Sequence, residues 1–204
     1  MDELFQGVRQ ALERRGFEVW AVPDAAAARE KALSLIPPEG SVGIGGSVTI
    51  RQLGLAEMLE SSGHAVWWHW TSPEERATVM ENARHADVYL ASANAVTRNG
   101  LLVNTDGTGN RVGALLDGPA LVILVIGRNK LVDGGLNEAL ARIRREACPP
   151  NAKRLGLNTP CAHTGRCDEA HCGDDCMCRG TAILHRPMRG QRTVVILTDE
   201  SLGY

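Results

Sequence analysis

The sequence lacks the features that define several large classes of protein. Its 22 Lys and Arg residues are matched by 24 Asp and Glu residues, and the formal net charge is −2. Nucleic acids and anionic membranes are bound through a surplus of positive charge, which this chain does not have. Aromatic residues are also sparse, at 4% of the chain. We therefore expect no nucleic-acid partner.

Long apolar runs are missing as well. The longest aliphatic run, residues 121–126, is far shorter than the roughly 20 residues that a helix needs to cross a bilayer. The N-terminal segment carries Asp and Glu at once and has no charged region followed by an apolar stretch, so it is not a signal peptide. These absences predict a cytoplasmic protein without a membrane span.

Signals for helices and strands alternate through the first two-thirds of the chain. Apolar residues recur at helical spacing over 4–12, and residues 17–22 then have the character of a strand. A short buried strand within 41–46 leads into a helical pattern over 48–63. This alternation predicts a single α/β domain over residues 1–204, with an open, mainly parallel sheet flanked by helices.

Two hairpins are expected beside the parallel sheet. The first joins a strand over 87–97 to a strand over 101–105 through a tight turn at Asn99–Gly100. The second is a C-terminal hairpin, because residues 181–186 and 192–200 both alternate as strands do and follow each other closely.

A glycine-rich corner lies between the short buried strand and the helix that follows it. Glycines let the backbone approach a ligand, and the N–H groups at a helix start attract anions. The corner is neither a P-loop nor a correctly spaced GxGxxG, and a tight turn capped by Ser47 or Thr49 is the alternative. The candidate anion-binding residues here are Gly43, Gly45, Gly46, Ser47 and Thr49.

A second corner, residues 104–111, holds more Asn, Thr, Asp and Gly than a simple turn requires. Arg111 falls in the first turn of the expected helix, where a cation is unfavourable unless an anion offsets it. Asp106 is the best-placed carboxylate for a catalytic base, with a turn-forming role as the alternative. The candidates are Asn104, Asp106, Gly107, Thr108, Gly109, Asn110 and Arg111.

Further polar residues follow strands at the same edge of the predicted sheet. Ligands of open α/β sheets bind beyond the carboxyl ends of the strands. Asn94 and Thr97 follow one strand, Asn129 and Lys130 follow another, and Arg154 adds a cation. Surface solvation is the alternative for Lys130 and Arg154. Together these residues predict a polar, net positive cleft that binds a small anionic ligand.

Cysteine is rare except in one segment. Five of the six cysteines lie between Pro160 and Cys178, within a stretch (148–180) that shows no periodicity. Such a loop needs something other than a hydrophobic core to order it. Cytoplasmic thiols more often bind metal or do redox chemistry than form structural disulfides.

Four thiolates from one loop can close around zinc or an iron–sulfur cluster. A redox dithiol and inert thiols are the alternatives, and His163 and His171 are available as nitrogen ligands. Cys148, apart from the group, is expected to pack at a helix end. The spacing matches neither zinc ribbons nor ferredoxins, being Cys161-x5-Cys167-x4-Cys172-x3-Cys176-x-Cys178.

Several unusual strings resemble the LUD-domain family of lactate-utilisation proteins, in particular its short, YkgG-type members. They occur in the same order and read GSVGIGGSVTIRQLGL, ADVYLASANAVTRNGLLVNTDGTGNRVGALLDGP, IGRNK, PPNAKRLGLNTPCAHTGRC and VVILTDESLGY. The resemblance runs from Gly40 onward. It implies a fold like that of glucosamine-6-phosphate deaminase, ribose-5-phosphate isomerase and the CoA-transferases, whose counterparts of residues 43–49 hold a phosphate or similar anion. Where those enzymes often carry an acidic residue, this chain has Asn94.

The resemblance also implies a role as an accessory component of L-lactate oxidation, with the other lactate-oxidation subunits as partners. The family's cysteine pattern implies Cys161, Cys167, Cys172 and Cys178 as metal ligands, with Cys176 as the alternative third ligand. The family's pathway favours an iron–sulfur cluster over zinc. Two other functions stay open: an enzyme acting on a phosphorylated or CoA-linked substrate, with purely structural cysteines, and an interaction module that docks on partner subunits.

Overall fold

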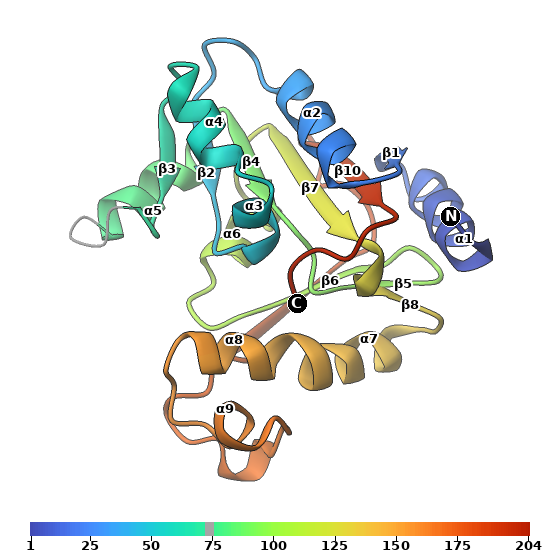
Figure 1. The fold of residues 1–204 in the computed structure, drawn as a ribbon, viewed down its shortest axis with the longest axis vertical. Helices are drawn as coiled ribbons and strands as arrows, with labels where there is room; N and C mark the ends of the chain where they lie inside the picture. The colour runs from blue at the N-terminus through green and yellow to red at the C-terminus, as the bar shows by residue number, and fades with distance from the viewer. Residues whose placement is uncertain (72–75) are drawn as a thin grey trace.

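The computed structural model describes residues 1–71 and 76–204, which form the open, mainly parallel α/β fold that the sequence predicts (Figure 1). In the described part, the large sheet has six parallel strands in the order β1-β10-β7-β4-β2-β3, and a smaller sheet has the order β8-β5-β6-β9. The large sheet consists of β1 (Glu18–Val22), β2 (Val42–Ile44), β3 (Val66–Trp68), β4 (Val88–Ala91), β7 (Leu121–Gly127) and β10 (Arg192–Thr198). The smaller sheet consists of β5 (Ala95–Thr97), β6 (Leu102–Asp106), β8 (Leu131–Val132) and β9 (Gly180–Leu184).

The helices surround these sheets, and among the described residues none is long and apolar enough to cross a membrane. They are α1 (Glu3–Arg14), α2 (Ala25–Leu35), α3 (Val48–Gln52), α4 (Leu55–Ser61), α5 (Arg76–Arg84), α6 (Asn110–Leu116), α7 (Leu136–Arg142), α8 (Cys148–Arg154) and α9 (Pro160–Thr164). The segment Ser72-Pro73-Glu74-Glu75, whose sequence has the pattern of a capping box, lies outside the described residues.

The core occupies both faces of the large sheet. On β7, Ile123 and Val125 pack with the apolar sides of α2, α3 and α4, whereas Leu124 and Ile126 pack with α1, α6 and the smaller sheet. A central parallel strand is buried on both faces, which is why β7 is a continuous apolar run. Burying each such side chain stabilises the fold by about 1.5–3 kcal/mol.

Helices α7 and α8 form one rod that covers the smaller sheet (Figure 1). A π-helical turn, Ile143–Ala147, joins them. Pro149 and Pro150 follow directly and have no N–H to donate to the preceding turn, so regular α-helical bonding is interrupted at this junction. The junction brings Cys148 into the apolar cluster between the rod and the smaller sheet.

The prediction of a C-terminal hairpin is wrong, because its two strands do not pair with each other. β9 pairs antiparallel with β6 in the smaller sheet, whereas β10 pairs parallel with both β1 and β7 in the large sheet. The physical reason lies in burial: Val194 and Ile196 face one core cluster, and Val195 and Leu197 face the other. A strand that is apolar on both sides fits the interior of a parallel sheet better than an exposed hairpin.

Three other boundaries also differ from expectation. The strand expected over 87–97 splits into β4 and β5, which belong to different sheets. The helix expected over 48–63 splits into α3 and α4 at Gly54, whose φ of +61° is incompatible with a continuous helix. The cysteine-rich stretch 148–180 is not irregular throughout, because its first residues form α8 and residues of α9 are also helical.

We predict that Gly43→Ala destabilises the fold. A Cβ at Gly43 would lie 2.1 Å from the carbonyl oxygen of Ala83 in α5, because β2 and α5 pack closely there. Overpacking of this kind costs about 1–3 kcal/mol, which urea denaturation would measure as a lower free energy of unfolding. Gly7→Ala in α1 is the control, since nothing lies within 4 Å of its Cβ position, and it should stabilise by about 0.5–1 kcal/mol. Equal stabilities of the two variants would contradict the packing account.

Candidate functional site

The carboxyl ends of β2, β4, β6 and β7 border a cleft of about 390 Å³. Its position agrees with the rule that open α/β sheets bind ligands at this edge. The candidate residues that line the cleft are Gly46, Ser47, Thr49, Asn94, Asp106, Gly107, Thr108, Asn110, Arg111, Lys130 and Arg154.

Three candidate glycines lie outside this lining. Gly43 packs against Ala83, as described above. A Cβ at Gly45 would lie 2.7 Å from the hydroxyl of Tyr89, so glycine permits this contact between strand end and side chain. Gly109 is the N-cap of α6 and has a φ of +77°. Each of these glycines has a structural reason to be there.

Three polar candidates also lie outside the lining. The Thr97 hydroxyl accepts a hydrogen bond from the Leu101 amide inside the β5–β6 hairpin. The Asn104 side chain is fully buried, and neither of its polar atoms has a partner among the described residues. The Asn129 side chain accepts from the Leu202 amide and therefore holds the C-terminal segment.

Lys130 forms the deep end of the cleft and is only 4% exposed. Its Nζ donates to the hydroxyl oxygens of Thr49, at 2.7 Å, and Ser92, at 2.8 Å. Burial, followed by the charges of Arg142 and Arg111, holds the pKa of Lys130 well below its usual value. No described carboxylate lies within ion-pair distance of Nζ, so an anion bound there would favour the protonated, charged form of Lys130.

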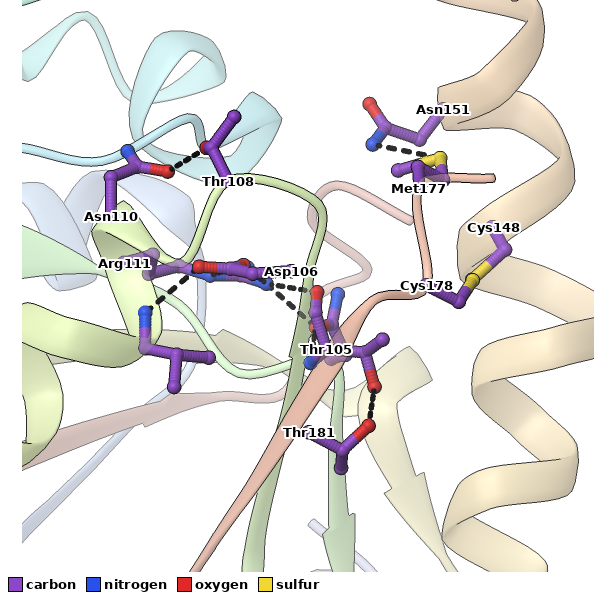
Figure 2. A network of polar contacts seen from close by, with 12 residues as sticks. Thr105, Asp106, Thr108, Asn110, Arg111, Cys148, Asn151, Met177, Cys178 and Thr181 are labelled. Atoms are coloured by element: carbon purple, nitrogen blue, oxygen red, sulfur yellow. Dashed lines mark hydrogen bonds and ion pairs between the residues drawn. The ribbon is translucent and has the colours of Figure 1, made fainter. Parts of the chain in front are cut away.

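Asp106 is held by the start of α6 (Figure 2). One carboxylate oxygen accepts two hydrogen bonds from Arg111, at 3.1 and 2.7 Å, and the other accepts from the Val112 amide at 2.8 Å. The guanidinium of Arg111 also donates to the side chain of Asn94. Because both of its oxygens are engaged, Asp106 is better suited to fixing Arg111 than to accepting a proton from a substrate.

His69 and Trp70 line the cleft directly after β3. His69 is 7% exposed, and its ring makes no hydrogen bond to a described residue. Burial, together with the charges of Arg76 and Arg154, lowers the pKa of His69 to about 4. The guanidinium of Arg154 lies 4.6 Å from the centroid of the Trp70 ring. This end of the cleft therefore combines a neutral imidazole, an aromatic face and a cation.

A second cavity, of about 100 Å³, lies beside the cleft and is lined by thiols. We call it the thiol chamber. The cysteines that line it come from α8, α9 and the loop before β9, and they are Cys148, Cys161, Cys167, Cys172, Cys176 and Cys178. Folding thus brings together every cysteine of the chain.

Neighbouring thiols in the chamber are close enough to influence one another. The sulfurs of Cys148 and Cys178 are 3.2 Å apart. This hydrogen bond and burial raise the pKa of Cys178. Burial and the adjoining Cys176 raise the pKa of Cys172 to about 12. Thiols of this kind keep their protons at neutral pH until a cation replaces them.

The histidines of the segment have other partners. His163 Nε2 lies 2.9 Å from the side-chain oxygen of Asn158, and His171 Nδ1 lies 2.9 Å from a carboxylate oxygen of Asp168. Neither histidine lines the thiol chamber as the described residues define it. Among those residues, no three Cys, His, Asp or Glu side chains converge on one point at the spacing that a single metal ion requires.

The cleft and the thiol chamber share a wall. Thr105, Cys148, Cys176 and Met177 line both cavities. Figure 2 shows the Asp106–Arg111 pair on one side of this wall and the Cys148–Cys178 pair on the other. Because the wall is so thin, an occupant of one cavity would lie next to an occupant of the other.

Comparison with known proteins agrees with this fold. The family model of the LUD domain matches residues 6–198. The chain belongs to the LUD-domain family. The LUD domain is also similar to the crystal structure of a DUF162 family protein from Deinococcus radiodurans, with a TM-score of 0.57 and 15% identity over 96% of each chain, a likeness that concerns the fold alone. No curated protein matches the sequence.

Sequence reasoning missed several residues of the LUD domain that line its cavities. His69 and Trp70 follow a strand at the carboxyl edge of the sheet, and this position in the sequence could have indicated that they line the cleft. Ser92 carried no signal of its own, because its role depends on Lys130, which reaches it from the short helix after β7. Cys148 does pack at a helix end, as expected, but it also faces both cavities and contacts Cys178.

We predict that His69 makes the LUD domain sensitive to acid. Because the pKa of His69 is about 4 in the folded protein and 6.5 at its ordinary value, the unfolded state binds a proton more readily. The contribution of neutral His69 to the free energy of unfolding is fully present above pH 6.5 and is lost as the pH falls toward 4.

Urea denaturation at two pH values, about 7 and about 5, would test this. His69→Gln should lose less stability on acidification than the parent protein does. His85→Gln is the control, because His85 directly follows α5, is exposed and lies beside Glu81. Equal losses in the parent protein and His69→Gln would contradict the assignment.

Proposed function

We propose that this LUD-domain protein is an accessory component of L-lactate oxidation that works with the other subunits of that oxidation. It holds an iron–sulfur cluster, with zinc as the alternative, in the thiol chamber, and it binds a small anionic molecule in the cleft. The observation that carries the proposal is the gathering of all six cysteines, from three segments, around one cavity. The LUD-domain match supports the lactate-utilisation context.

Position relative to the two cavities supports the choice of ligands. Cys148 and Cys176 line both cavities. The cysteines that line the thiol chamber and not the cleft are Cys161, Cys167, Cys172 and Cys178. We assign these as the ligands.

The lactate-utilisation context of the family favours a cluster over zinc. Zinc binds sulfur at about 2.3 Å, so a tetrahedral site needs sulfurs roughly 3.8 Å apart. No three ligating side chains of the described residues converge in this way, and the thiols instead surround an open volume of about 100 Å³. Binding either group would therefore require the thiols to draw together around it.

When bound, a cluster supplies one-electron transfer, and the chain's own residues determine its surroundings. Asp168 and Glu169 line the thiol chamber, and Arg144 pairs with Glu169 at 3.0 Å. The net negative surroundings would disfavour the addition of an electron and so lower the reduction potential. Coordination would also order the loop 167–178, which contributes little to the apolar core.

A second candidate function is an enzyme acting on a phosphorylated or CoA-linked substrate, with structural cysteines. The observation that favours it is Lys130, a buried cation that contacts hydroxyl groups and no described carboxylate. In that function, Thr49, Ser92 and Lys130 would bind the anionic group of the substrate, and His69 would be the neutral acid–base group.

We predict that anaerobic reconstitution with iron and sulfide loads the full chain, because four thiolates face the chamber alone. Iron and sulfide content and the visible absorption spectrum would measure the loading. Cys161→Ser, Cys167→Ser, Cys172→Ser and Cys178→Ser should each lose most of the bound iron.

Cys148→Ser and Cys176→Ser are the matched controls and should keep it. If all six variants kept the iron, or if Cys148→Ser and Cys176→Ser lost as much iron as the others, the ligand assignment would be rejected. Zinc uptake with no iron–sulfur absorption would select the zinc alternative.

A further inference from the structure

The charges that line the cleft do not balance. Five described cationic side chains face it, and only three described carboxylate side chains do. The cations are Arg76, Arg111, Lys130, Arg154 and Arg179, and the carboxylates are Asp106, Asp174 and Asp175. With Lys130 protonated, the described side chains of the lining carry two positive charges in excess, which a dianion would neutralise.

One cation without a described carboxylate partner lies at the deep end. Arg111 is neutralised by Asp106, whereas the hydrogen bonds of Lys130 to described residues go to the hydroxyls of Thr49 and Ser92. An isolated charge in a buried position is costly unless a partner is present. The three donors of an ammonium group are not exhausted by two hydroxyl groups, so one N–H of Nζ is available to an oxyanion.

Another cation without a described carboxylate partner lies at the outer end. Both hydrogen bonds of the Arg154 guanidinium go to the neutral side chain of Asn151, and no described carboxylate lies within ion-pair distance. The guanidinium lies over the Trp70 ring, which restricts its motion, and beside it lies the ring of His69, which makes no hydrogen bond to a described residue. A planar, pre-positioned guanidinium of this kind binds carboxylate or phosphate with two parallel hydrogen bonds.

The two ends belong to different parts of the fold. Lys130 follows β7 and is influenced by Arg142 and Arg111, whereas His69 follows β3 and is influenced by Arg76 and Arg154. The cleft that joins them measures about 390 Å³. At roughly 30 Å³ for each water-sized group, this volume holds about twice as many non-hydrogen atoms as lactate has.

We infer that the cleft binds an elongated dianion, with one carboxylate or phosphate on Lys130, Thr49 and Ser92 and a second anionic group on Arg154 beside Trp70. The inference rests on the anion-binding part of the proposed function and is independent of the metal. It separates the ligand of the cleft from lactate and other short monocarboxylates, which would occupy only one end.

The test uses linear dicarboxylates from succinate to suberate, each paired with the monocarboxylate of the same chain length, titrated calorimetrically into the full chain. Affinity should peak at one chain length, which measures the separation of the two cations. The best dicarboxylate should bind at least about tenfold more tightly than its paired monocarboxylate, since each added charged contact is worth roughly one such factor. Exchanging one carboxylate of that length for a phosphonate gives a single compound, because the diacid is symmetric, and its affinity relative to the diacid would show whether the cleft prefers phosphate at one of its ends.

Variants locate the two ends. Lys130→Met and Arg154→Met should each reduce the affinity for the best dicarboxylate to that for the monocarboxylate. Lys153→Met, also on α8 but exposed and outside the lining, is the matched control and should bind as the parent does. If Lys130→Met fails to fold, as thermal unfolding would show, Arg154→Met at the half-exposed end still decides the question.

The outcomes separate this inference from the function on which it rests. Monocarboxylate binding that depends on Lys130, with no gain from a second carboxylate at any length, would overturn the inference alone. Binding of neither class of acid would overturn the anion-binding function as well. An equal loss in Lys153→Met would show that the effect is not specific to the cleft and would reject the two-ended site.

Discussion

The parallel pairing of β10 between β1 and β7 is the constraint on which the rest of the structure depends. All seven residues of β10 pair with β7, and β1 joins the large sheet only through β10. Because β10 ends at the carboxyl edge, the residues after it reach the cleft. Leu202 there bonds to Asn129 and Thr49, next to Lys130. One strand thus both completes the core and closes the deep end of the cleft.

A second element connects the two cavities. The buried guanidinium of Arg142 donates to the carbonyl oxygens of Asn94, Asn129 and Tyr204, and so holds α7 against three segments of the carboxyl edge. The π-helical turn and α8 follow directly, and α8 contributes Cys148 to the thiol chamber and Arg154 to the cleft. The residues proposed to bind the metal and those proposed to bind the anion are therefore positioned by the same helices. This is why the thiol chamber and the cleft share a wall.

Local patterns were enough to predict the alternating architecture, the β5–β6 hairpin and the polar edge, because periodicity, turns and strand ends depend on neighbouring residues. The partners of β9 and β10 were not predictable in this way, since pairing with β6 and β7 depends on residues far away in the chain. The part played by Ser92 at Lys130, and the contact between Cys148 and Cys178, also arise only when separate elements meet.

The central claim is that the thiol chamber holds a metal group. The most direct test measures iron, acid-labile sulfide and zinc, with the visible absorption spectrum, in the full chain purified without oxygen. The account predicts iron and sulfide in equal amounts and broad absorption at the blue end of the spectrum. Zinc at about one per chain would keep the chamber as a metal site and reject the cluster. Metal-free protein with all six thiols titratable would contradict the claim.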